Sequence, residues 1–188
     1  MIPRYNPNKW NKNKYRQGSH NCYSYFLNKT SRRFERECKK TKKINKRLRC
    51  RRPQPGYAAG YPPISDPKKY TCRRINRRLL ADNPRIRRSS RRRRCSRGYY
   101  KGALVMDPRP KTDIDYHFYR QDRGGLWSHK DGWGPATNKD ARGKVIEDPA
   151  DASRDYRKNK GRGKGKNYTQ VCGYYCVPKD KRKKRMAI

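Results

Sequence analysis

The sequence is poor in acidic residues. Its 188 residues include 15 Asp and Glu against 54 Lys and Arg, which gives a formal net charge of +39. Such an excess of one sign destabilises a compact chain unless polyanions or acidic neighbours offset it. The acidic residues are not spread evenly, because residues 102–156 contain 10 of them together with 9 basic residues. The sequence therefore predicts a nearly neutral folded core with basic arms, and it argues against a wholly disordered basic tail.

Long apolar runs are also missing. No segment is long enough for a membrane-spanning helix, and residues 1–14 lack the apolar stretch of a signal peptide. We therefore expect synthesis in the cytoplasm. The length fits one domain, placed at 19–178, with an extended basic arm at 1–18, basic insertions at 31–52 and 85–97, and a basic tail at 179–188.

A Cys-x-x-Cys pair is absent, although the chain has seven cysteines. The spacings of His20 with Cys22 and of Cys172 with Cys176 are weak signals for zinc, so we expect no metal and no cofactor. Seven is an odd number, so one thiol stays free if the other six form three bridges, in one of fifteen connectivities. We expect Cys22 to be the free thiol.

Residues 113–131 predict a β-hairpin, because aromatic and branched residues alternate with polar ones on both sides of Asp-Arg-Gly at 122–124. A loop with Gly124 in the left-handed conformation would set His117 opposite His129. This pairing indicates either a chemical site or ordinary aromatic packing. Strand alternation places Asp115, His117, Tyr119, Trp127 and His129 on one face, and Ile114, Tyr116, Phe118, Leu126 and Ser128 on the other.

A first helix is expected within 19–28, capped by Ser19 or Asn21. Cys22 then lies in the first turn, where the helix dipole favours a thiolate, although a buried structural cysteine or a disulfide partner explains it equally well. The remaining expected elements are a basic helix at 31–50, a helix at 66–81, and strands at 99–106, 144–147 and 168–177.

The most basic segment is 85–97, and residues 157–167 alternate Gly with Lys and Arg. Runs of this kind contact phosphates or acidic protein surfaces when they are not simply solvated. The expected polyanion-binding residues are Arg87, Arg88, Arg91, Arg92, Arg93, Arg94, Lys164 and Lys166.

An Asn-Cys pair that opens a helix, followed by one histidine on a hairpin strand and a second twelve residues later, resembles the NlpC-type papain-like cysteine hydrolases. The resemblance implies an α+β fold, with an N-terminal helix packed against a small antiparallel sheet. It also implies that Cys22 is the nucleophile, His117 the base and His129 the group that orients the base. Asn21 takes the place of an acidic residue often found there, and the long basic insertions depart from compact hydrolases.

Four stretches are similar to a family of uncharacterised proteins of large DNA viruses. They are Arg-Pro-Gln-Pro-Gly at 52–56, Tyr-Lys-Gly-Ala-Leu-Val-Met-Asp-Pro at 100–108, Asp-Tyr-His-Phe-Tyr-Arg-Gln-Asp at 115–122 and Cys-Gly-Tyr-Tyr-Cys-Val-Pro at 172–178. The resemblance implies a virion protein made in the host cytoplasm.

Three functions fit the sequence. The first, which we favour, is a structural component of a virus particle, such as a minor capsid protein, anchored by basic arms to capsid proteins or other virion components. Nucleic acid or an anionic membrane surface are further partners that this charge allows. The second is an active cysteine peptidase or amidase with a Cys-His-His triad. The third is a nucleic-acid-binding protein of ribosomal type, because Arg and Lys runs interleaved with Tyr suit phosphate contact and base stacking.

Overall fold

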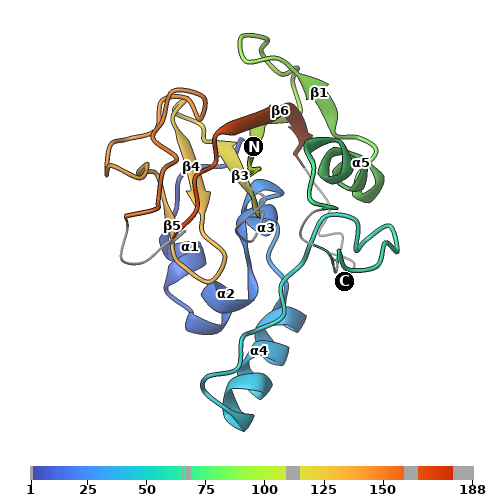
Figure 1. Ribbon diagram of the computed structural model, residues 1–188, viewed down its shortest axis with the longest axis vertical. Helices are drawn as coiled ribbons and strands as arrows, with labels where there is room; N and C mark the ends of the chain where they lie inside the picture. The colour runs from blue at the N-terminus through green and yellow to red at the C-terminus, as the bar shows by residue number, and fades with distance from the viewer. Residues whose placement is uncertain (1, 65, 67–68, 109–114, 159–164, 180–188) are drawn as a thin grey trace.

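The computed structural model describes residues 2–64, 66, 69–108, 115–158 and 165–179. It has a mixed α+β fold built on one small antiparallel sheet, which confirms the expected class (Figure 1). The helices are α1 (Asn8–Asn11), α2 (Lys14–Ser19), α3 (Cys22–Phe26), α4 (Arg32–Ile44) and α5 (Cys72–Asp82). Within these ranges, no helix combines the length and the apolar character needed to cross a bilayer. The papain-like arrangement stays a prediction.

The sheet has six strands in the order β1-β6-β2-β3-β4-β5, all antiparallel to their neighbours. The strands are β1 (Arg87–Ser89), β2 (Tyr99–Asp107), β3 (Asp115–Gln121), β4 (Trp127–Lys130), β5 (Ala136–Thr137) and β6 (Gln170–Pro178). The expected strand at 144–147 is wrong. Val145 and Ile146 form only isolated bridges, to Lys139 and Trp127 respectively.

Each face of the sheet carries its own apolar core, because side chains of a strand alternate between faces. On β2, Leu104 and Met106 enter one cluster, whereas Ala103 and Val105 enter the other. The first core is covered by α3 and α5, and includes Phe26, Ile75, Leu79, Tyr116, Phe118 and Tyr175. The second core is covered by the chain between β5 and β6, and includes Tyr119, Trp127, Ile146, Tyr156, Tyr168 and Tyr174.

Helix α3 packs closely on the sheet at a glycine. The Phe26 side chain is fully buried and lies over Gly102 of β2, where a Cβ atom would overlap its ring. The Phe26 ring also packs against Phe118 of β3, with a centroid separation of 4.7 Å. Gly102 is therefore required for close approach, and the contact fixes α3 relative to β2 and β3.

The register of the central hairpin differs from the expected one. His129 is paired with Tyr119, and Gly125, not Gly124, has the positive φ of 86°. The reason is the turn: Asp122 N–H donates to the Leu126 carbonyl at 2.9 Å, which moves the loop one residue along the chain. The pairing shifts by two residues in consequence, so the expected faces are retained for the residues that the structure describes. Ile114 lies outside those residues.

The N-terminal segment is not an extended arm. Residues 8–19 form α1 and α2, and Trp10 is almost completely buried against Tyr25 and Ala136. The expected helix at 66–81 begins only at Cys72, because Thr71 caps it by accepting the N–H of Arg74 at 3.2 Å. The basic N-terminal segment is therefore part of the folded body.

Three disulfides brace the fold: Cys38–Cys50, Cys72–Cys172 and Cys95–Cys176. The second joins the start of α5 to β6, and the third joins the basic segment that follows β1 to the same strand. Cys22 is buried and unpaired, which confirms that expectation.

Candidate functional site

Cys22 is the first residue of α3, and the helix begins there because the Asn21 side chain caps it. Asn21 Oδ1 accepts the N–H of Ser24 at 3.2 Å, and Asn21 Nδ2 donates to the Pro53 carbonyl at 2.7 Å. The Cys22 side chain is 6% exposed. Burial raises the pKa of the thiol to about 12, and the negative charge of Asp115 makes a smaller contribution in the same direction. The group is therefore protonated at neutral pH, and the thiolate expected at a helix N-terminus does not form.

The two hairpin histidines form a buried pair, diagonal to one another across β3 and β4. His117 Nε2 lies 2.8 Å from His129 Nδ1, and His129 Nε2 lies 3.0 Å from the Lys139 carbonyl. The carbonyl can only accept, so His129 carries its proton on Nε2 and accepts at Nδ1 from His117 Nε2–H. This arrangement leaves Nδ1 of His117 unprotonated. Burial holds the pKa of His117 well below its ordinary value, and the charges of His129 and Lys130 make smaller contributions in the same direction.

The thiol and the histidine pair belong to different cores. Cys22 packs in the cluster that contains Tyr116 and Phe118, whereas alternation along β3 turns His117 to the opposite face, toward Tyr168. Within the described part of the chain, no hydrogen bond joins the Cys22 thiol to His117. A catalytic triad of Cys22, His117 and His129 therefore remains a prediction.

Sequence reasoning missed the charged groups around Cys22. The Arg52 guanidinium lies near the thiol and lowers the thiol's pKa, but its effect is smaller than that of burial. Arg52 itself is held over the Trp133 ring, 3.5 Å from its centroid. Tyr168 OH donates to Asp115 at 2.9 Å, and burial raises the pKa of that carboxyl. No sequence signal predicts these contacts, because the partners lie far apart along the chain. Among the described residues, no group of three or more His, Cys, Asp or Glu could hold a metal ion.

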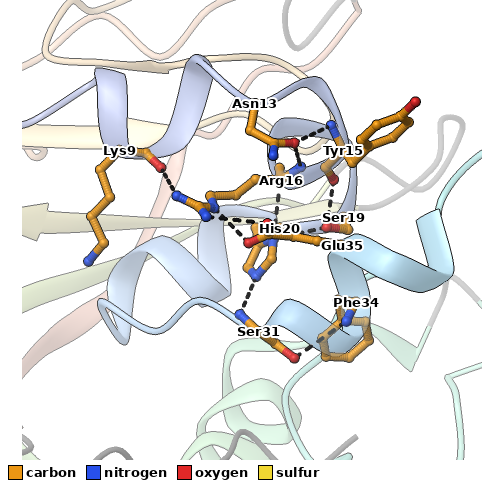
Figure 2. Close-up of polar contacts among 9 residues, drawn as sticks. All are labelled: Lys9, Asn13, Tyr15, Arg16, Ser19, His20, Ser31, Phe34 and Glu35. Carbon is orange, nitrogen blue, oxygen red and sulfur yellow. Dashed lines mark hydrogen bonds and ion pairs between the residues drawn. The ribbon is translucent and has the colours of Figure 1, made fainter. Parts of the chain in front are cut away.

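The third histidine joins two helices and was also missed. His20 Nε2 accepts the Ser31 N–H at 2.8 Å, so its proton is on Nδ1, which donates to the Arg16 carbonyl at 3.0 Å (Figure 2). Arg16 also holds Glu35 of α4 through Nε at 2.6 Å and Nη2 at 3.2 Å. The ring is completely buried, and burial lowers the pKa of His20 to about 4. These contacts attach the N-terminal end of α4 to α2.

The expected polyanion-binding residues have different surroundings. Arg91 is paired within the molecule, to Asp148 at 3.3 Å and to Asp151. Arg87 lies over the Tyr99 ring. Lys164 lies outside the described residues, and Lys166 is half-buried. The exposed members of the set are Arg87, Arg88, Arg91, Arg92, Arg93 and Arg94.

Comparison with known proteins gives a partial similarity. No protein-family model matches the chain, and no solved structure matches it. Over 52 residues the chain is 50% identical to "Insoluble matrix shell protein 1" of Ruditapes philippinarum. The aligned part is 28% of this chain and 32% of that protein, so the chain spans about a third of the length of the curated relative that it matches.

Proposed function

We propose that this chain is a structural protein of a particle or matrix, held to acidic neighbours by its basic surface, and not an active hydrolase. The observation that carries the proposal is the state of Cys22. A thiol with a pKa of about 12 that packs inside an apolar core lacks the nucleophilic form that cysteine catalysis needs. The other six cysteines all form cross-links.

The disulfides and the comparison also support a structural role. Three disulfides persist in an oxidising setting, which a particle or matrix outside the cell provides. The name of the relative describes an insoluble shell protein, and such a protein is a structural one. The finer form of the proposal is a virion component, such as a minor capsid protein, that binds capsid proteins. It rests on the resemblance to proteins of large DNA viruses.

Sedimentation with poly-L-glutamate tests the structural role, because that polymer presents carboxylates as an acidic protein neighbour would. We expect co-sedimentation at low salt and steep loss as salt rises, since bound counterions are released and surface charges are screened. Replacing Arg92, Arg93 and Arg94 with Ser should flatten the salt dependence. Arg92→Ser and Arg91→Ser each remove one charge and form a matched pair, and Arg91→Ser should change the salt dependence less, because Asp148 and Asp151 already pair with that guanidinium. Association that is independent of salt would contradict electrostatic anchoring.

An active cysteine peptidase or amidase is the second candidate, and the histidine pair favours it. The bond from His117 to His129 fixes one tautomer and leaves Nδ1 of His117 able to accept a proton. For this activity the Cys22 thiol would have to reach His117 across the edge of β3. Turnover of fluorogenic peptide amides that disappears in Cys22→Ala, with the fold retained by circular dichroism, would establish the hydrolase and overturn the structural proposal.

A further inference from the structure

Helix α4 and the turn after it form a hairpin closed by a disulfide, and this hairpin projects from the body of the molecule (Figure 1). The end of this hairpin that lies nearest the body of the molecule is held in place. Cys38 and Cys50 are buried and linked, and the Arg49 guanidinium lies 4.3 Å from the centroid of the Trp133 ring. Residues 39–48, between these anchors, are called the tip below.

The tip is cationic throughout. It contains six basic residues and no acidic residue, and most of its side chains are exposed. Its backbone is held in shape, because Lys42 Nζ donates to the Lys46 carbonyl at 2.7 Å and Leu48 N–H donates to the Asn45 carbonyl at 3.1 Å. The six basic residues are Lys39, Lys40, Lys42, Lys43, Lys46 and Arg47.

Two aliphatic side chains stand among these charges. Ile44 is 81% exposed and Leu48 is 45% exposed, and they are the two most exposed large apolar side chains in the described part of the chain. A solvated charged tip does not require either of them. Aliphatic side chains surrounded by Lys and Arg are typical of segments that lie at a membrane interface, where the apolar groups enter the acyl boundary and the cations stay among anionic headgroups.

We propose that the tip docks on an anionic lipid bilayer, with Ile44 and Leu48 inserted and the exposed basic side chains around them on the headgroups. Residues 39–48 contain no aromatic residue, so the tip lacks the platform on which nucleic-acid bases stack. An acidic protein surface would satisfy the charges but gives no reason for the exposed aliphatic pair. The proposal adds a lipid partner for one element and does not rest on the structural role proposed above.

Vesicle flotation tests the proposal, with mixed phosphatidylserine and phosphatidylcholine vesicles as the probe and pure phosphatidylcholine vesicles for comparison. Measurement at raised salt reduces adsorption by the overall charge, so that insertion of the aliphatic pair is visible. We expect the double variant Ile44→Ser/Leu48→Ser to partition about tenfold less than the wild type. Leu126→Ser is the matched control, because Leu126 is 44% exposed but lies in another loop, and it should not change partitioning.

Duplex DNA and poly-L-glutamate separate the lipid from the other anionic partners. The double variant should bind both polymers as the wild type does, since no charge is changed. Equal partitioning of the wild type and the double variant would overturn the proposal, and so would a failure of the wild type to bind the mixed vesicles. A matching loss of DNA or polyglutamate binding in the double variant would assign the tip to that polymer instead. If the wild type does not bind poly-L-glutamate, the structural role is contradicted, but the vesicle result still stands.

A fluorescence measurement supplies a second readout. Ile44→Trp keeps a large apolar side chain at the tip, and its emission should be quenched by vesicles that contain brominated acyl chains. Leu126→Trp is the control and should not be quenched more than the wild type. Equal quenching of the two variants would mean that the tip does not enter the bilayer.

Discussion

His20 should make the fold sensitive to mild acid. The neutral ring is enclosed between α2 and α4, and both ring nitrogens are used by hydrogen bonds (Figure 2). Burial is the largest influence on its pKa and lowers it, and the charges of Lys130 and Arg16 act in the same direction. The hydrogen bond to the Arg16 carbonyl and the charge of Glu35 act against it, and the result is a pKa of about 4. Protonation would remove the acceptor that Nε2 offers to Ser31 N–H.

The sign and size of the effect follow from linkage. In the unfolded chain an ordinary histidine binds its proton near pH 6.5, whereas His20 in the folded chain does so only near pH 4. The unfolded state therefore binds more protons between these values, and stability falls as pH falls. The contribution of His20 to the free energy of unfolding is fully present above pH 6.5 and is lost as the pH falls toward 4. A depression of this size corresponds to about 3 kcal/mol of unfolding free energy.

Denaturant unfolding of the wild type and of His20→Gln, repeated from pH 7 to pH 4, measures this contribution. Gln can accept the Ser31 N–H but does not titrate. The variant should be less stable at pH 7, because the ring contacts of His20 with Trp10 and Phe34 are lost, but it should lose about 3 kcal/mol less on acidification. His117 is present in both proteins, so its own titration cancels in the difference. Parallel curves for the two proteins would refute the reasoning.

Three further changes should alter stability, each measurable by denaturant unfolding. Gly102→Ala places a methyl group against the buried ring of Phe26 and should cost about 1–3 kcal/mol, whereas an unchanged midpoint would mean that α3 can shift. Replacing Cys72 and Cys172 with Ser opens a cross-link with a sequence separation of 100 and should cost roughly 4 kcal/mol, which reduction of the wild type should at least match. Asp82→Ala removes the acceptor of one tyrosine hydroxyl and two backbone N–H groups and should cost about 2 kcal/mol or more, so a neutral effect would show that water replaces it.

The sequence predicted the features of the fold that depend on local periodicity. The alternation of side chains in the hairpin was sufficient to assign Tyr119 and Trp127 to one face and Phe118 to the other, because a strand has a period of two whatever its partner is. It was not sufficient for the register. The position of the turn is defined by hydrogen bonds within it, such as those from Asp122 N–H to the Leu126 carbonyl and from Gly125 N–H to the Asp122 carbonyl, and the side-chain pattern does not report them.

Long-range contacts explain what the sequence did not predict. Helices α1 and α2 have few apolar residues, and they are held by contacts such as that of Trp10 with Tyr25, whose ring centroids are 5.0 Å apart. His20 has its role only because Arg16 and Ser31 meet around it. For the candidate site, Cys22 was correctly expected to be free and to open a helix. Its state depends on burial, and a sequence motif does not report burial.

The burial of Cys22 also determines how long the cross-links keep their connectivity. One free thiol beside three disulfides is enough to rearrange them, because a thiolate attacks a disulfide sulfur and releases a new thiolate. Because burial raises the pKa of Cys22 to about 12, its thiol is far less ionised at pH 7 than an ordinary thiol. Exchange must therefore wait for an opening of the first core. The lifetime of the native disulfide pairing is then set by the rate of unfolding.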